Sequence, residues 1–331
     1  MKVGKVSESV LKRSVLKRIH KRRKEVLVSA GVGQNFSAVE VGEDEIVVLS
    51  TNPSTCTPQY IGTMALHRTL NSLLASGAEG IGVLVSILLP DGAREIAIRR
   101  IMDQVEVEAK QLDLAVIGGN TQVTAGVVQP IVTITAVGKC KKDGLLKQKK
   151  MMPGTQLVLT KWTGLTGSAI LAENTYEKLQ QRYTSSFLNG LQEFTEHCSV
   201  AKEAGIACSH GATVMHAVSQ SGIYGALWDM ASAANIGVEV DLEAVLLRQE
   251  TVEVCEFFDF NPYQLDSTGS LLIACQDGAG LVAKLAKEGI VASVIGRVIA
   301  GNDKVVIREG EAFHLEPPKA SGLEGRKGEM G

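Results

Sequence analysis

Residues 81–89 read IGVLVSILL, residues 93–112 read AREIAIRRIMDQVEVEAKQL, and residues 114–119 read LAVIGG. The first stretch is an apolar run, with Ser86 as its one polar residue, that stops at Pro90, which predicts a buried strand. The second carries apolar residues at helical spacing and predicts a long helix. The third predicts a short strand that runs into a turn at Gly118-Gly119. A strand, a helix and a second strand in this order are typical of a mixed α/β layer.

The same alternation continues on both sides of this stretch. Residues 46–49 and 127–137 are rich in apolar and β-branched side chains, which predicts two further strands. Residues 61–76 carry an apolar stripe at helical spacing that ends before Gly77, which predicts a helix. His67 is placed on the solvated side of that helix. Residues 141–150 are polar, basic and rich in turn formers, and they mark the best domain boundary.

The second half repeats the mixed pattern with its own strands and helices. Strands are predicted at residues 156–160, 238–242, 270–275 and 291–299, and helices at 167–173, 186–196, 222–235 and 277–288. The sequence therefore predicts an α/β (α+β) fold with two domains, residues 1–150 and 151–315. Residues 316–331 are expected to form a disordered tail.

Composition limits the class of protein. At 331 residues, with 45% hydrophobic and 21% charged residues, the chain suits a soluble globular protein of roughly two domains. A net charge of −2 disfavours a nucleic-acid partner. Residues 81–89 form the longest apolar run, which is too short to span a bilayer, and no signal-peptide pattern is seen. The six scattered cysteines favour reduced thiols, with Cys255 and Cys275 in the core. We expect a cytoplasmic protein without a membrane partner.

A basic segment precedes the first strands. Its cations are Lys12, Arg13, Lys17, Arg18, Lys21, Arg22, Arg23 and Lys24. Apolar residues at helical spacing within it predict a surface helix with a solvated basic face. Contact with an anionic partner, a membrane or a polyphosphate is the alternative.

Several loops carry Asn, Gln, Ser or Ala where a magnesium-nucleotide site would carry Asp or Glu. They lie at residues 31–35, 50–53, 70–72, 118–122 and 215–222. Magnesium binds through carboxylates, waters and substrate phosphates, and a neutral amide supplies an oxygen without the charge. Each amide alone is also a common turn residue, because its side chain bonds to nearby backbone. Two explanations predict that all of these loops lose their acidic residues. One is relaxed selection on the carboxylates after loss of the metal, and the other is a switch to a ligand that binds without metal.

The order and spacing of these motifs resemble a known family over residues 3–315. The matching runs are residues 31–33, 49–53, 77–79, 118–121, 214–216, 222–228, 237–241, 255–263 and 269–274. They resemble the AIR synthase-related (PurM-like) superfamily, and within it the HypE-like hydrogenase maturation proteins. The resemblance implies an N-terminal α/β domain and a C-terminal α/β sandwich domain. It also implies a homodimer in which the N-terminal domains close a β-barrel across the two-fold axis.

The resemblance further implies ATP in a cleft, with aspartates holding magnesium on its phosphates, and ATP-driven activation of a carbonyl, amide or thiocarboxylate oxygen. Carried over to this chain, the nucleotide- or ligand-binding candidates are Gly33, Gln34, Asn35, Asn52, Asn71, Gly118, Gly119, Asn120, Thr121, Lys161, His216 and Gly222. The acidic family positions hold Gln34, Asn35, Asn52, Ser72, Asn120 and Ala217 instead. ATP therefore remains a candidate ligand, whereas magnesium is not expected and no metal site is predicted.

Two of these candidates have plain structural alternatives. His216 is either a partly buried histidine satisfied by its surroundings or a group that contacts the ligand. Lys161, which follows a predicted strand, is either structural or an anion contact, and Thr166-Gly167 offers backbone N–H groups to an anion.

Two functions remain open at this point. One is a HypE-like, ATP-binding protein of hydrogenase-type metalloenzyme or cofactor maturation with impaired magnesium–ATP chemistry. The other is a catalytically silent paralogue that acts as a binding or regulatory subunit, in a homodimer or with an active relative or a maturation partner. HypE-like proteins end in a cysteine that carries the carbamoyl group, and here no cysteine follows Cys275.

Overall fold

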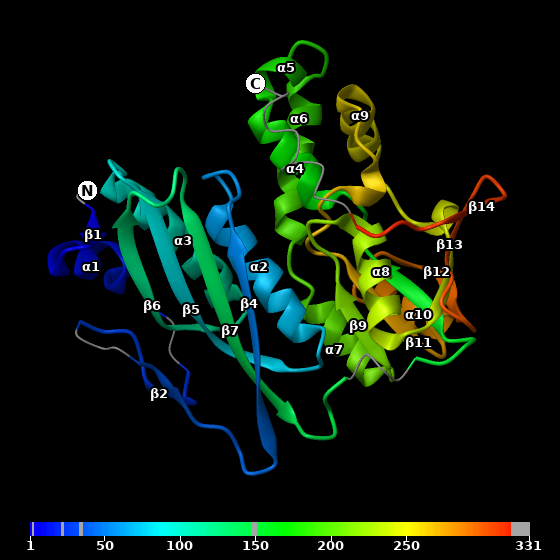
Figure 1. The fold of residues 1–331 in the computed structure, drawn as a ribbon, viewed down its shortest axis with the longest axis horizontal. Coiled ribbons are helices and arrows are strands. Elements are labelled where there is room, and N and C mark those ends of the chain that lie inside the picture. The colour runs from blue at the N-terminus through cyan, green and yellow to red at the C-terminus, as the bar shows by residue number, and fades with distance from the viewer. Residues whose placement is uncertain (2, 21–22, 33–35, 147–150, 319–331) are drawn as a thin grey trace. The chain divides into compact units, whose positions relative to one another are not determined.

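The computed structural model describes residues 1, 3–20, 23–32, 36–146 and 151–318. The chain forms two compact units, Met1–Leu145 and Leu146–Gly331 (Figure 1). The first is built around a five-stranded sheet and the second around a seven-stranded sheet, each with its own helices. The predicted mixed α/β class is confirmed. Residues 319–331, most of the predicted tail, lie outside the described residues.

The first sheet has the strand order β1-β6-β5-β7-β4. Its strands are β1 Gly4–Lys5, β4 Glu45–Ser54, β5 Glu79–Pro90, β6 Ala115–Thr124 and β7 Ile131–Lys141. The helices of this unit are α1 Glu8–Ser14, η1 Leu16–Arg18, α2 Ile61–Leu74 and α3 Glu95–Gln111. β5 and β6 pair in parallel, with α3 between them in sequence, whereas β7 is antiparallel to both β5 and β4. In the single described chain the sheet is open, with β1 and β4 at its edges, so a barrel closed by a second copy stays a prediction.

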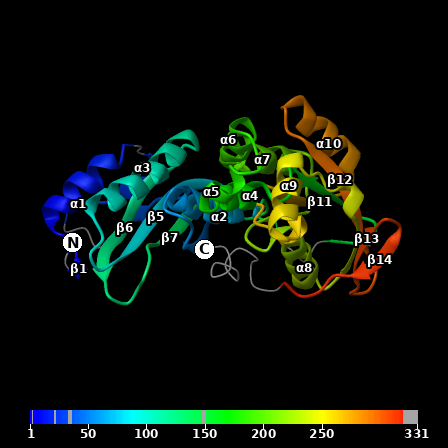
Figure 2. The ribbon, with the colours of Figure 1, turned by 90° about the horizontal axis from the view of Figure 1, so that it is seen from above.

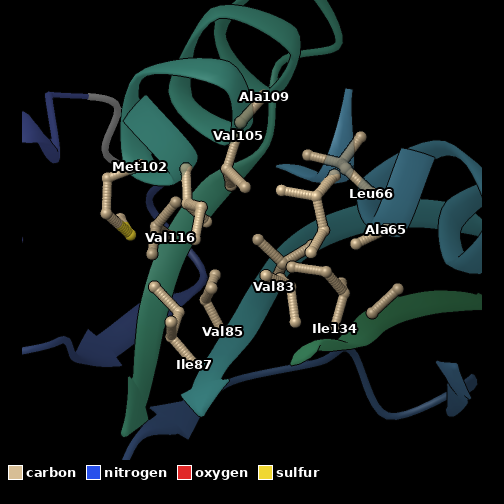
Figure 3. Packing of buried hydrophobic residues seen from close by; sticks show 14 of the residues in the cluster. Ala65, Leu66, Val83, Val85, Ile87, Met102, Val105, Ala109, Val116 and Ile134 are labelled. Carbon is tan, nitrogen blue, oxygen red and sulfur yellow. The ribbon is translucent and has the colours of Figure 1, made fainter. Parts of the chain in front are cut away.

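Helices cover one face of this sheet. Figure 2 shows α1 and α3 on the same side of β5, β6 and β7. The core between these layers is aliphatic, and Figure 3 shows Val105 of α3 and Leu66 of α2 above Val83 of β5. α2 and α3 pack so closely at Gly62 that a Cβ there would lie only 2.7 Å from the carbonyl oxygen of Ile101. The scarcity of aromatic residues is therefore matched by tight aliphatic packing.

A predicted turn at Gly118-Gly119 and a predicted loop at residues 50–53 are wrong. β6 continues through Gly118-Gly119 to Thr124, and β4 continues through Asn52 and Pro53. The paired strands come so close at Gly119 (φ +151°) that a Cβ there would lie 1.9 Å from the carbonyl oxygen of Val85. The two glycines therefore permit a bulged strand and not a turn. Pro53 is tolerated because β4 is an edge strand.

The other face of the first sheet is only partly covered. A small hairpin of β2 (Val26–Val28) and β3 (Ala38–Val39) packs on Ala115, Ile117 and Val137. Beyond this hairpin, Val47 and Leu49 of β4 are 46% and 64% exposed. Because side chains alternate along a strand, these two residues form an apolar stripe on the face opposite the helices.

The second sheet has the strand order β14-β13-β10-β12-β8-β11-β9. Its strands are β8 Gln156–Thr160, β9 Val214–Ala217, β10 Gly237–Asp241, β11 Leu271–Cys275, β12 Ala292–Ile299, β13 Lys304–Arg308 and β14 Glu311–His314. α8 (Gly222–Ala234) lies against one face, and α7 (Ala201–Ser209) and α10 (Gly278–Lys287) lie against the other (Figure 2). The strands predicted in this half are confirmed to within a residue or two.

A helical lobe completes the second unit. It consists of α4 Leu165–Asn174, α5 Tyr176–Leu179, α6 Ser185–Glu193, η3 Phe194–His197 and α9 Gln249–Phe258, which share a separate apolar cluster. Two short 3-10 turns, η4 Leu242–Ala244 and η5 Pro262–Gln264, connect this lobe and the sheet. Cys255 and Cys275 are buried, as predicted.

The basic segment folds as α1 and η1 on the surface of the first unit. Arg13 pairs with Glu95 of α3, and Arg18 with Asp103 of the same helix, which neutralises part of the basic face. One side-chain prediction is wrong: His67 is buried between α2 and α3, where its Nε2 lies 3.0 Å from a carboxylate oxygen of Glu108. Among the described helices none is long and apolar enough to cross a bilayer.

Candidate functional site

The loop residues predicted in the first unit lie on three elements. Gly33, Gln34 and Asn35 fall outside the described residues. Asn52 lies on β4 and Asn71 on α2. Residues 118–121, which comprise Gly118, Gly119, Asn120 and Thr121, lie on β6.

The register of the sheet separates Asn52 from Asn120. Asn52 pairs with Ile134, which lies in the core beneath the helices, and Asn71 is buried on α2 over the same face. On β5, Val85 pairs with Ile134 and belongs to the core, and the next residue, Ser86, pairs with Asn120. Neighbouring residues of a strand point to opposite faces, so Asn120 and Ser86 lie on the face without helices. Two of the predicted amides therefore lie on one side of the sheet and Asn120 on the other.

A cavity of about 680 Å³ includes residues 118–121 of β6 and extends across β5 and β7 to Val47 and Leu49 of β4. None of the described residues that line it has an ionisable side chain. Its polar lining consists of hydroxyls and one amide: Ser37, Ser86, Asn120, Thr121, Thr133 and Thr135. Ser37 already donates to the carbonyl oxygen of Ile117 at 2.7 Å, and Thr135 shares a 2.9 Å hydrogen bond with Thr51. The remaining lining is aliphatic apart from Phe36.

This lining does not fit magnesium. A hard divalent cation needs anionic oxygens to offset the loss of its water. In the described part of the chain, no group of three or more His, Cys, Asp or Glu side chains is arranged to hold a metal ion. The hydroxyls and the amide of Asn120 can donate and accept hydrogen bonds, but they cannot neutralise a metal or a triphosphate.

In the second unit, the ammonium of Lys161 is held by its own fold. It donates to the carbonyl oxygens of His197 at 3.0 Å and Ser199 at 2.5 Å, and of Gly269 at 3.1 Å. It also pairs with a carboxylate oxygen of Glu203 at 2.5 Å. These four oxygens occupy all three donors of the ammonium group. The arrangement ties the end of β8 to η3, α7 and the loop before β11.

The start of α4 meets a carboxyl group from the same chain. Asp266 is 2% exposed, and its Oδ1 accepts from the hydroxyl of Thr166 at 2.7 Å. The same oxygen accepts from the backbone N–H of Thr268 at 2.9 Å and from its hydroxyl at 2.7 Å. Gly167 donates its N–H to the carbonyl oxygen of Asp266 at 2.8 Å. The backbone N–H of Gly167, which was predicted to bind an external anion, is therefore already bonded to Asp266 of the same chain.

Asp266 stands at none of the family's motif positions, so motif reasoning assigned it no role. A local signal exists, because Asp followed by Ser-Thr-Gly is typical of a turn in which the side chain bonds to backbone two residues on. That signal accounts for the bond to Thr268 and gives no indication of Thr166, one hundred residues away.

His216 and Gly222 lie at the two ends of the β9–α8 connection. The ring of His216 lies 4.0 Å from a carboxylate oxygen of Asp229, and burial lowers its pKa below the usual 6.5 against the opposing effect of that carboxylate. Gly222 has φ +62°, and a Cβ there would lie 2.3 Å from the carbonyl oxygen of Tyr263. The positive φ and the close packing at the start of α8 therefore explain why a glycine occupies position 222.

Comparison with known proteins gives this geometry a context. The model of the AIR synthase related protein N-terminal domain matches residues 33–140, and that of the C-terminal domain matches residues 152–309. The chain is 26% identical to the carbamoyl dehydratase HypE of Rhizobium leguminosarum bv. viciae, over 84% of this chain and 79% of that protein.

Solved structures share the fold. A crystal structure of E. coli HypE has a TM-score of 0.80 at 16% identity and covers 96% of this chain and 99% of that one. A structure of HypE in complex with ATP has a TM-score of 0.76 at 16% identity, with 95% of each chain covered. A HypE–HypF complex gives a TM-score of 0.72 at 17% identity, covering 82% of this chain and 90% of that one.

Proposed function

The chain belongs to the AIR synthase related family, and we propose that it is a HypE-like protein of hydrogenase-type metalloenzyme or cofactor maturation with impaired magnesium–ATP chemistry. The matched domains account for most of the chain, and the similarity to HypE spans both of them. A similar structure crystallised with ATP makes this nucleotide the first ligand to consider.

The observation that carries the impairment is the uncharged lining of the first-unit cavity. The residues of this chain would hold a nucleotide there through the hydroxyls of Ser86 and Thr133 and the amide of Asn120. Such neutral groups orient a ligand through hydrogen bonds, each contributing roughly 0.5–1.5 kcal/mol net. They offer nothing to offset the charge that builds up when a terminal phosphate is transferred.

The second candidate function is a catalytically silent paralogue that acts as a binding or regulatory subunit. It is favoured by the same cavity, and by Lys161 and the start of α4, whose polar groups are already engaged within the fold. Such a subunit would act through its surfaces. The exposed stripe of Val47 and Leu49 is the surface that we propose for pairing with a second copy or an active relative.

Thermal unfolding with ATP, with and without magnesium, tests the proposal. A ligand present at 100 times its dissociation constant stabilises the folded state by about 2.7 kcal/mol. We expect ATP to produce a small upward shift in the unfolding temperature at millimolar concentration, and magnesium to add nothing to it. A shift that appears only when magnesium and ATP are present together would contradict impaired magnesium–ATP chemistry.

A further inference from the structure

A second cavity, of about 340 Å³, lies entirely within the second unit. It is enclosed by the start of α8, by η5, by the β13–β14 hairpin and by the extended segment that follows this hairpin. Figure 1 labels α8, β13 and β14. Its floor is formed by Leu242, Val306 and Leu315, all of which belong to the buried core of the unit. An apolar floor with a few polar groups at the mouth is the usual form of a small-molecule site.

The hairpin register places an aromatic ring and a cation on the same wall. Val306 and Arg308 are two residues apart on β13, so they point to one face. Phe313 pairs directly with Val306 and shares that face. Phe313 is 49% exposed although it lines the cavity, so part of its ring remains accessible. The segment beyond the hairpin is fixed by a 2.7 Å hydrogen bond from the N–H of Leu315 to the carbonyl oxygen of Lys304.

A second aromatic side chain of the lining is Tyr224, which is stacked on Tyr263. The rings of Tyr224 on α8 and Tyr263 on η5 stack at 5.6 Å between centroids and 15° between planes. The hydroxyl of Tyr263 lies 3.5 Å from the carbonyl oxygen of Leu242, which helps to fix the ring on which Tyr224 stacks. Burial is the main cause that raises the pKa of Tyr224, so its phenol stays neutral at physiological pH. A flat apolar group that enters the cavity would meet the two aromatic side chains of its lining, Tyr224 and Phe313.

Opposite charges stand at the mouth. Arg308 and Glu316 both line the cavity, together with His314. The ion pair of Arg308 with the neighbouring Glu309 is long, at 3.6 Å, and both side chains are mostly exposed, so it competes weakly for the guanidinium. A guanidinium binds a carboxylate through two parallel hydrogen bonds. A ligand that carries both a carboxylate and an ammonium would match the two charges of the mouth.

We propose that this cavity binds a free amino acid with an aromatic side chain. The carboxylate pairs with Arg308, the ammonium faces Glu316, and the ring enters between Tyr224 and Phe313. The proposal concerns a cavity of the second unit only, so it does not depend on nucleotide binding in the first.

Three probes of the same shape test the proposal by calorimetric titration of the full chain. They are L-phenylalanine, phenethylamine, which lacks the carboxylate, and 3-phenylpropionate, which lacks the ammonium. We expect L-phenylalanine to bind best, and removal of the carboxylate to weaken binding about tenfold, which is equivalent to about 1.4 kcal/mol. Equal affinity for the three probes, or no binding of L-phenylalanine, would overturn the proposal.

Two matched variants locate the site. Arg308→Gln should bring the affinity for L-phenylalanine down to that for phenethylamine, because both then lack the carboxylate–guanidinium pair. Arg297→Gln is the control, since Arg297 is a comparably exposed arginine on β12 that pairs with Glu239 and does not line this cavity. Phe313→Ala should weaken all three probes together. An equal loss of affinity in Arg308→Gln and Arg297→Gln would place binding elsewhere.

Discussion

Replacement of Asp266 by alanine tests how the second unit holds the start of α4. The change removes the carboxyl group, of which one oxygen accepts three hydrogen bonds, from the hydroxyl of Thr166 and from the N–H and hydroxyl of Thr268. All three residues are almost fully buried, so the donors cannot turn to water. A buried donor left without an acceptor costs about 1–3 kcal/mol.

The expected loss is smaller than three full penalties. The hydroxyl of Thr166 also lies 3.2 Å from the carbonyl oxygen of Asp266, which alanine retains, so this donor keeps a partner. The N–H of Thr268 also lies 3.1 Å from the hydroxyl oxygen of Thr166, so it keeps an acceptor too. That leaves the hydroxyl of Thr268, and we expect Asp266→Ala to lower the free energy of unfolding by about 1–3 kcal/mol. Asp266→Asn keeps the acceptor oxygen and should cost clearly less.

Urea unfolding followed by tryptophan fluorescence measures this loss. The chain has two tryptophans, Trp162 and Trp228, and both belong to the second unit, so the signal reports on that unit. The matched control is Asp277→Ala at the exposed start of α10, where the carboxyl accepts one hydrogen bond, from the N–H of Gly280 at 2.9 Å. Loss of such a cap costs about 1 kcal/mol. If Asp266→Ala cost no more than Asp277→Ala, the reasoning about the buried carboxyl would be refuted.

Three further predictions follow from side chains already described. Burial keeps the folded-state pKa of His216 below 6.5, so as the pH falls the unfolded chain binds a proton at this histidine before the folded chain does. Wild type should therefore lose stability relative to His216→Gln below about pH 6.5. A constant difference between their urea midpoints from pH 5 to 8 would contradict this. By light scattering, wild type should be a dimer and Leu49→Glu a monomer. Ile96→Glu, at a comparably accessible position on α3, should stay dimeric. A monomeric wild type would reject the proposed interface. Asn52→Asp combined with Asn120→Asp should not create magnesium binding, because the new carboxylates lie on opposite faces of the sheet; calorimetric heat on magnesium addition would show otherwise.

Local patterns were enough to predict most elements of the fold. Residues 156–160 form a strand because an apolar, β-branched run follows a Pro-Gly turn, and the predicted bounds match β8. The error at Gly118-Gly119 has a physical cause. Glycine pairs usually mark turns, but here they permit close contact of two parallel strands, which depends on Val85 some thirty residues earlier.

The candidate site was harder to predict because it depends on long-range contacts. Helical spacing placed His67 on the outer side of its helix, and only the packing of α3 places Glu108 beside its ring. The family's loop positions suggested that Asn52 and Asn120 act together, whereas the strand register puts them on different faces. The chemical character of the loops, amides in place of carboxylates, was visible in the sequence and agrees with the uncharged lining of the cavity.

Calorimetric titration of ATP into the full chain, once with magnesium and once with a chelator, tests the central claim most directly. The uncharged lining around residues 118–121 predicts weak binding with the same affinity in both titrations, because no described carboxylate of this cavity can hold the metal on the phosphates. Tight binding that disappears with the chelator would contradict the claim and would require a magnesium site in this chain.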